Sequence, residues 1–367
     1  MSTRPTLLLG PGPSNVHPRV LDAMARPLWG HLDPRFLEVM NEVQDHLRRL
    51  FGTSNRMTLP LSATGSAGME ASLVNLLEPG DPVVVGVAGV FGVRMCEVAR
   101  RAGAEVARVD AEWGTPLDPA AMADAVERVR PKVVAFVHAE TSTGVLQPVP
   151  EIAATAREAG AMVVLDTVTS LGGSAVRLDE WGVDVAYSGT QKCLAVPPGL
   201  APISFSDRAV DAVERRTVPV QSWYLDVSLL AGYYGSERAY HHTAPISAIF
   251  GLAEGLRLIE EEGLDERIQR HQAAGRLLVD RLADSGFTAL VDEAVRLPQL
   301  TTAILPDSVR DREGDIRRRL LEDHDIEVGG GLGPLAGRIW RIGLMGENAR
   351  PESIERLTAA LADVLPD

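Results

Sequence analysis

The chain has 367 residues, with 36 basic and 50 acidic side chains and a formal net charge of −14. This length exceeds what one hydrophobic core usually supports, so we expect two domains that share an interface. The acidic surplus repels phosphate backbones and anionic lipid surfaces, which argues against nucleic-acid and membrane partners.

Export and membrane insertion find no support in the sequence. The N-terminal residues lack the long apolar run of a signal peptide, and no segment reaches the roughly 18 apolar residues of a membrane span. The two cysteines, Cys96 and Cys193, have neither the spacing of a disulfide framework nor that of a metal site. We therefore expect a cytoplasmic protein without a metal centre.

Strands and helices are predicted to alternate from about residue 56 to residue 205. Short apolar runs bounded by Gly, Pro or Asp predict buried, mostly parallel strands at residues 82–88, 132–138, 162–166, 183–188 and 201–205. Between them, helical spacing of apolar residues predicts helices at residues 66–77, 92–102, 119–129 and 151–159. This alternation is typical of an α/β layer architecture.

The pattern changes after about residue 250. Two helical segments are expected around residues 249–261 and 264–282, followed by a strand (300–305), a helix (312–323), short strands (326–328 and 339–342) and a last helix with one apolar face. We interpret this as a smaller α+β domain. The expected division is an N-terminal arm (1–15), a large domain (16–262) and a small C-terminal domain (263–367).

The strongest chemical signal lies between Asp166 and Lys192. Each residue follows a predicted strand, and Lys192 is one of only two lysines, the other being Lys132. Ligands of open α/β sheets bind beyond such strand ends, so the acid and the amine are expected in one crevice. That pair suits pyridoxal 5′-phosphate (PLP): the amine condenses with its aldehyde, and the carboxylate keeps its pyridine nitrogen protonated. The alternative is a structural aspartate and a surface lysine.

A phosphate cradle and a ring partner are also predicted. Thr64, Gly65 and Ser66 form a small, hydroxyl-rich turn that opens a helix, and a helix N-terminus suits a phosphate. An ordinary capped helix would have the same sequence. Phe91 begins the helix after the strand at 82–88 and can stack on a cofactor ring, or simply belong to the core.

Three further segments are candidates for substrate and phosphate contacts. Arg341 lies in an apolar strand and needs a paired anion there, such as a substrate carboxylate or an internal ion-pair partner. Gly12 belongs to a rigid Gly-Pro turn that can bring backbone close to a substrate, or be an ordinary turn. Tyr240 and Thr243 can donate hydroxyl groups to a phosphate.

These pieces, in this order, resemble the class V aminotransferases of fold-type I, and above all the alanine–glyoxylate/serine–pyruvate aminotransferase group. The resemblance covers nearly the whole chain and is carried by LLGPGPSN (8–15), LLEPGD (76–81), STGVLQP (142–148), SLGG (170–173), YSGTQK (187–192), YHHT (240–243), GGLGP (330–334) and RIG (341–343). It implies a large domain with a mostly parallel seven-stranded sheet sandwiched by helices, and a smaller C-terminal α+β domain. It also implies a homodimer with its sites at the subunit interface.

The resemblance assigns a role to each matching residue. Lys192 matches the Schiff-base lysine and Asp166 the partner of the pyridine nitrogen. The other matches are the phosphate cup (Thr64, Gly65, Ser66, Gln191), the hydroxyl beside the ring (Thr141), phosphate contacts from the second subunit (Tyr240, Thr243) and the carboxylate anchor (Arg341). Phe91 stands where relatives often carry Trp, and Ser66 where some carry His; both changes can loosen cofactor binding.

The implied reaction is a two-stage transamination through pyridoxamine phosphate. Alanine, serine or both donate the amino group, and glyoxylate or pyruvate accepts it. Lys192 is the expected general base, for which its amine must be neutral and its pKa depressed. The alternatives are aminotransferases acting on ureidoglycine or pyridoxamine, a class V lyase such as a cysteine desulfurase, which needs a reactive Cys, and a binding module without PLP.

Overall fold

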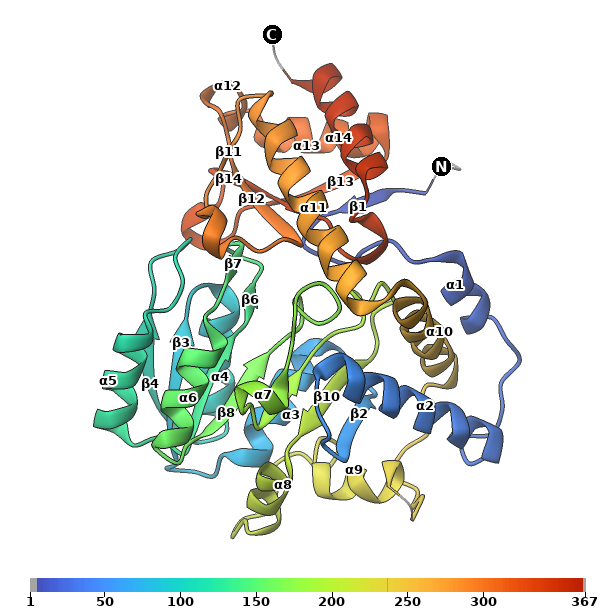
Figure 1. Ribbon diagram of the computed structural model, residues 1–367, viewed down its shortest axis with the longest axis vertical. Coiled ribbons are helices and arrows are strands. Elements are labelled where there is room, and N and C mark those ends of the chain that lie inside the picture. The colour runs from blue at the N-terminus through green and yellow to red at the C-terminus, as the bar shows by residue number, and fades with distance from the viewer. Residues whose placement is uncertain (1–4, 236, 366–367) are drawn as a thin grey trace.

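The computed structural model describes residues 5–235 and 237–365 (Figure 1). Its larger sheet has seven strands in the order β2-β10-β9-β8-β5-β3-β4. Their bounds are β2 Met57–Leu61, β3 Pro82–Val87, β4 Glu105–Asp110, β5 Val133–Val137, β8 Met162–Asp166, β9 Val185–Tyr187 and β10 Ala201–Phe205. Only β10 runs antiparallel to its neighbours, so the predicted mostly parallel seven-stranded sheet is confirmed.

Helices cover both faces of this sheet, as the apolar strands require. Every residue of β5 is buried, because a parallel sheet is shielded on each side. Right-handed crossovers send α3 (Gly65–Leu76) and α4 (Val90–Arg101) to one face. They send α5 (Pro119–Val129) and α6 (Val149–Glu158) to the other, where the two helices pack together (Figure 1).

Further elements surround the larger sheet. Helices α1 (Pro18–Met24) and α2 (Pro34–Phe51) pack against the long α10 (Ile246–Glu262). The remaining elements of this part of the chain are the hairpin of β6 (Ala139–Glu140) and β7 (Val145–Leu146), and the helices α7 (Leu178–Trp181), α8 (Asp207–Glu214) and α9 (Val227–Tyr234).

The smaller sheet has five strands in the order β1-β13-β14-β12-β11. Its strands are β1 Leu7–Leu9, β11 Thr288–Ala289, β12 Leu300–Ile304, β13 Ile326–Gly330 and β14 Ile339–Gly343. The accompanying helices are α11 Leu264–Ala283, α12 Asp307–Arg310, α13 Glu313–His324 and α14 Pro351–Val364, with short 3-10 turns η1 Glu293–Val295, η2 Gly333–Leu335 and η3 Gly346–Asn348. The predicted α+β character of this part is confirmed.

The buried apolar side chains form two large hydrophobic cores and a small third cluster with residues from both parts of the chain. The buried residues of the larger core lie between Val20 and Ile259, whereas those of the smaller core are Leu9 and residues between Ala274 and Val364. The chain passes from one to the other at Gly263, between α10 and α11. Leu9 belongs to the smaller core because β1 pairs in parallel with β13, so the arm completes the small sheet.

Two strands of the large sheet, β2 and β4, lie outside the predicted set. Both are edge strands. Strand β4 alternates between exposed and half-buried residues and so lacks a continuous apolar run. Strand β2 contains Pro60, which lowers strand propensity everywhere except at an edge.

Candidate active site

A cavity of about 400 Å³ opens where the large sheet meets the first turns of α3 and α4. Eight of the residues predicted to bind a cofactor line it: Thr64, Gly65, Ser66, Phe91, Thr141, Asp166, Gln191 and Lys192. They come from five separate segments, so tertiary folding brings the predicted constellation together.

Asp166 ends strand β8 and is 4% exposed. The backbone N–H of Val168 donates to its Oδ1 at 2.8 Å, and the Tyr187 hydroxyl donates to its Oδ2 at 2.7 Å. Burial outweighs these hydrogen bonds and raises the pKa of Asp166 to about 6. A cationic group that binds in the cavity would therefore lie beside a carboxyl that ionises readily near neutral pH.

Tyr187 is a site residue to which the sequence analysis assigned no separate role. It lies directly opposite Asp166 in the β8–β9 pair and is fully buried. Because adjacent residues of paired strands share a face, the register of these two strands was the signal that could have identified it.

Lys192 lies in the loop after β9, with its amine turned toward the turn at residues 11–13. Its Nζ donates to the carbonyl of Pro11, and the Ser14 hydroxyl donates to the Lys192 carbonyl at 2.9 Å. A Cβ atom on Gly12 would come within 2.6 Å of the lysine Cδ, so a larger residue in this turn would displace the Lys192 side chain. Burial is the main cause that lowers the pKa of Lys192 to about 8, and the charge of Arg341 acts in the same direction.

Helix α3 presents an uncapped N-terminus to the cavity. Its N-cap residue, Thr64, makes no side-chain capping hydrogen bond. The first N–H groups of a helix lack intrahelical partners, so they are available to an anion. Gln191 adds a half-buried side-chain amide to the lining, and its NH2 group can donate hydrogen bonds to an anion. These features fit the phosphate of PLP.

The side chain of Glu140 holds the start of α4 in place. Its Oε2 accepts from the N–H of Phe91 at 3.2 Å, and its Oε1 accepts from the Ser142 hydroxyl at 2.6 Å. Ser142 in turn accepts from the N–H of Val90 at 2.9 Å. Burial raises the pKa of Glu140. This cap comes from β6 and its turn, about 50 residues along the chain, and positions Phe91 at the cavity.

Arg94 is a second lining residue that sequence reasoning missed. Its guanidinium carbon lies 4.9 Å from the centre of the Phe91 ring, and its Nη1 donates to Ser66 Oγ at 3.4 Å. Residues three apart share a helix face, so the spacing from Phe91 was the available signal. Arg94 thus adds a positive charge beside the predicted phosphate cup.

Arg341 reaches the edge of the site from the small sheet. It is 8% exposed, and its Nε donates to the Gly330 carbonyl at 2.8 Å while Nη1 donates to the Thr141 carbonyl at 3.4 Å. Burial lowers its pKa. Within residues 5–235 and 237–365, no carboxylate lies at ion-pair distance from it, so the internal salt bridge considered above is absent from that part of the chain.

Tyr240 and Thr243 lie away from the cavity of their own chain. Tyr240 is 64% exposed, and its hydroxyl lies 3.5 Å from Thr243 Oγ1. Their neighbours are packed inward: His241 stacks on Trp223 with ring centres 4.4 Å apart, and His242 Nε2 lies 2.7 Å from Ser62 Oγ. The predicted role of Tyr240 and Thr243, as contacts to a second subunit, stays a prediction.

Neither a metal-binding cluster nor a membrane-spanning helix is found in residues 5–235 and 237–365. These residues contain no group of three or more His, Cys, Asp or Glu side chains placed to hold a metal ion. None of their helices combines the length and apolar character needed to cross a membrane.

Known proteins resemble this chain over nearly its full length. A family model described as "Aminotransferase class-V" matches residues 6–333. Alanine–glyoxylate aminotransferase of Oryctolagus cuniculus is 41% identical, covering 98% of this chain and 92% of that protein, and (S)-ureidoglycine–glyoxylate transaminase of Bacillus subtilis is 39% identical, covering 98% and 90%. The crystal structure of alanine–glyoxylate aminotransferase from Nostoc sp. superposes with a TM-score of 0.97 at 49% identity, covering 99% of this chain and 96% of that one. The chain belongs to the class-V aminotransferase family.

Proposed function

We propose that this aminotransferase moves the amino group of a small amino acid, alanine or serine, to glyoxylate or pyruvate, with PLP held in the cavity. The observation that carries the proposal is the meeting of a buried amine, Lys192, and a buried carboxyl, Asp166, in one cavity beside an uncapped helix. The names of the rabbit and Nostoc relatives support the substrate class.

The residues present match the parts of PLP one by one. Lys192 would hold the aldehyde carbon, Asp166 the pyridine nitrogen and Phe91 the ring face. The first turn of α3, with Gln191, would hold the phosphate. When bound, the cofactor supplies an electron sink for the carbanion at the substrate Cα.

Lys192 has the properties of a proton carrier. With a pKa near 8, a useful fraction of its amine is neutral near physiological pH, which an ordinary lysine would not provide. With its amine free and neutral, Lys192 would accept the proton of the substrate Cα at Nζ and hold it for return to the bound reactants. The buried carboxyl of Asp166 would be held ionised by a protonated pyridine nitrogen beside it.

Arg341 would bind the substrate carboxylate. A guanidinium forms a bidentate pair with a carboxylate, and Arg341 is buried without an acidic partner in the described chain. One such anchor favours donors and acceptors with a single carboxylate.

A second candidate donor is (S)-ureidoglycine, because the relative named for it is nearly as similar as those named for alanine. A donor panel separates the two. Alanine, serine, ureidoglycine and pyridoxamine are each supplied with glyoxylate or pyruvate, and the new amino acid is quantified. Alanine or serine with glyoxylate is expected to give the highest kcat/KM; a preference for ureidoglycine would replace the first assignment.

A lyase that uses a reactive cysteine finds little support in the site. Cys96 and Cys193 are both buried, and burial raises the pKa of Cys193 to about 12 and raises that of Cys96 as well. Low-pKa, accessible thiolates are what such chemistry needs.

We also propose an oligomeric state. A homodimer in which Tyr240 and Thr243 complete the partner's phosphate cup explains why these hydroxyls are exposed beside an inward-packed His-His pair. Two free, buried thiols are compatible with a reducing compartment such as the cytoplasm.

The chain's two lysines allow a matched test of the cofactor assignment. Lys192→Arg removes the amine nucleophile, whereas Lys132→Arg keeps a cation beside Asp81, with which Lys132 pairs at 2.6 Å. Borohydride reduction of the PLP-loaded protein is expected to fix a pyridoxyl label on Lys192 in the wild type and in Lys132→Arg, and to leave Lys192→Arg unlabelled and inactive. A label on Lys132 would place PLP at the other lysine, and no label in the wild type would indicate a protein that does not use PLP; either result would overturn the proposal.

A further inference from the structure

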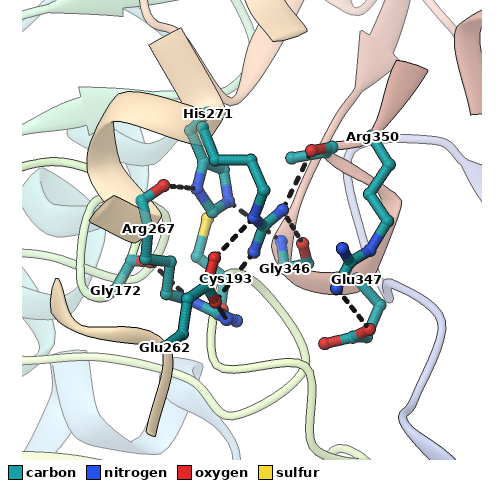
Figure 2. Close-up of polar contacts among 10 residues, drawn as sticks. Gly172, Cys193, Glu262, Arg267, His271, Gly346, Glu347 and Arg350 are labelled. Atoms are coloured by element: carbon teal, nitrogen blue, oxygen red, sulfur yellow. Dashed lines mark hydrogen bonds and ion pairs between the residues drawn. The ribbon is translucent and has the colours of Figure 1, made fainter. Parts of the chain in front are cut away.

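A cluster of charged side chains lies at the junction of α10 and α11, outside the cavity (Figure 2). Glu262, the last residue of α10, pairs with Arg267 Nη1 at 2.5 Å and with Arg270 Nε at 2.5 Å. Although burial raises it, the hydrogen bond from Arg270 and the charge of Arg267 bring the pKa of Glu262 down to about 2. One carboxylate thus holds two guanidinium groups at the point where the chain passes between the two cores.

Arg267 turns toward the loop that carries the lysine. It is 2% exposed, and it donates to the carbonyls of Cys193 at 2.8 Å and Gly172 at 3.2 Å (Figure 2). Cys193 directly follows Lys192, and its thiol donates to the carbonyl of Thr169, which lines the cavity. Arg267 therefore holds the backbone of Cys193, the residue that directly follows Lys192.

Arg270 and His271 turn toward the small sheet. Arg270 Nη1 donates to the carbonyls of Gly346 and Ala349, both at 2.9 Å. The N–H of Gly346 donates to His271 Nε2 at 3.1 Å, and His271 Nδ1 lies 2.8 Å from the Arg267 carbonyl, so the ring is neutral and bonded at both nitrogens. This segment follows β14, the strand that carries Arg341.

We propose that Glu262, Arg267 and Arg270 form a positioning clamp that sets the separation between the Lys192 amine and the Arg341 guanidinium. The inference rests on the proposed function, in which a substrate must reach both groups at once. Its amino end meets the cofactor at Lys192 and its carboxylate meets Arg341, so the clamp decides whether one small amino acid can span them. None of its three residues touches the cavity.

The charge balance explains why this arrangement is sensitive to one residue. Without the Glu262 carboxylate, the buried Arg267 and the half-buried Arg270 would lie close together with no counter-charge between them, which is unfavourable. The two guanidinium groups would move apart. Arg267 would then shift the loop that follows Lys192, and Arg270 would shift the segment at residues 346–349. A misplacement of reacting groups by about 1 Å can cost on the order of a hundredfold in rate.

Glu262→Gln tests the clamp, and Glu42→Gln is its control. Glu42 forms a bidentate pair with Arg257 of the same helix, α10, at 2.6 Å, but contacts neither the lysine loop nor the small sheet. Three quantities are measured: the Kd of PLP, which depends on Lys192; the Kd of propionate by its effect on the bound cofactor's absorbance, which depends on Arg341; and the KM of alanine, which depends on both.

Glu262→Gln is expected to change each Kd by less than about twofold and to raise the KM of alanine about tenfold. Hydrogen–deuterium exchange is expected to quicken at residues 193–196 and 346–349 together. Glu42→Gln should leave all of these at wild-type values. Arg267→Lys keeps the charge but loses the hydrogen bonds to the two carbonyls, and it should show a smaller rise in the KM of alanine. It replaces Glu262→Gln as the test if Glu262→Gln does not fold.

An alanine KM in Glu262→Gln and Arg267→Lys no higher than in Glu42→Gln would overturn the clamp. So would parallel losses of all three quantities, which would indicate general destabilisation. Failure of the proposed function has a different signature, namely a wild-type protein that takes no pyridoxyl label at Lys192.

Discussion

The two central ionisable groups have pKa values displaced toward each other by the same cause. Burial raises the pKa of Asp166 to about 6 and lowers that of Lys192 to about 8, although each charge favours the other. Desolvation therefore outweighs their mutual attraction. Both groups are less charged near neutrality than their free counterparts, which is the state that a lysine nucleophile requires.

The depressed pKa of Lys192 predicts the pH dependence of cofactor capture. The rate at which the apoprotein captures PLP is expected to rise with pH and to level off above a midpoint near 8, because only the neutral amine attacks. An ordinary lysine would give a rate that rises until about pH 10.4. Stopped-flow absorbance measures the rate, with Lys192→Arg as the blank. A rate that still climbs at pH 10 would contradict the assigned pKa.

The raised pKa of Asp166 predicts a stability cost in the apoprotein. A carboxyl whose folded-state pKa lies above its unfolded value of 3.8 weakens folding as pH rises from about 4 through 6. The difference of about two in pKa corresponds to at most about 3 kcal/mol at pH 7. Asp166→Asn is thus expected to stabilise the apoprotein by up to that amount, while transamination falls by orders of magnitude.

Urea unfolding of the wild type and of Asp166→Asn at pH 7 and at pH 4 checks this expectation. The gain should be present at pH 7 and much smaller at pH 4, where the folded state holds the proton and the unfolded state is only partly ionised. An equal gain at both pH values would show that ionisation is not its source.

At the level of elements, two segments remote in sequence prepare the cavity. The hairpin of β6 and β7 supplies Glu140, which caps α4 and fixes Phe91. The turn at residues 10–13 brings backbone against the Lys192 side chain, and Gly12 there has φ +103°, a conformation that favours glycine. Strand β1 of the small sheet ends at Leu9, directly before this turn, so the turn is tied to the small sheet.

Gly12→Ala is expected to slow PLP capture at least about tenfold, because its Cβ would lie 2.7 Å from Lys192 Nζ. Gly80→Ala is the matched control: φ is +88°, and no atom lies within 4 Å of the added Cβ. Both variants should lose about 1–2 kcal/mol of stability from the left-handed backbone alone. If capture slowed equally in both, backbone strain rather than contact with the lysine would be responsible.

At the scale of the whole molecule, one chain holds most of a site and lacks the two hydroxyls predicted for its phosphate. Tyr240 and Thr243 are outside the cavity lining, and the segment they belong to is anchored through His242 to Ser62, three residues before Gly65. A second copy of the chain is the proposed source of the missing contacts, and closed twofold symmetry would make each site complete the other.

Subunit mixing tests this arrangement. Lys192→Arg and a Tyr240→Phe/Thr243→Ala double variant, each nearly inactive alone, are unfolded together and refolded. If the hydroxyls act across the interface, half of the dimers are mixed and each mixed dimer regains one intact site, giving roughly a quarter of wild-type activity. Mixtures with no more activity than the separate variants would assign the two hydroxyls to their own subunit or to no site.

Most of the fold and the centre of the site could be predicted from local signals. Buried parallel strands are continuous apolar runs, and an acid and a lysine that follow such runs must lie at the same edge of the sheet, so Asp166 and Lys192 were predictable together. The start of helix α3 at Gly65 was predictable for the same reason, because it depends on a short stretch of sequence. The edge strands β2 and β4 were missed because edges do not need continuous burial.

The sequence by itself determined which residue types stand at the ends of strands and helices, and hence the chemistry that they can perform. Only the tertiary structure decided which of them meet. The Tyr187 hydroxyl bonds Asp166, Glu140 caps a helix about 50 residues away, and β1 joins the sheet of the other core. Such pairings depend on strand order and on the docking of two cores, which are set by the free energy of the whole chain and not by any short segment of it.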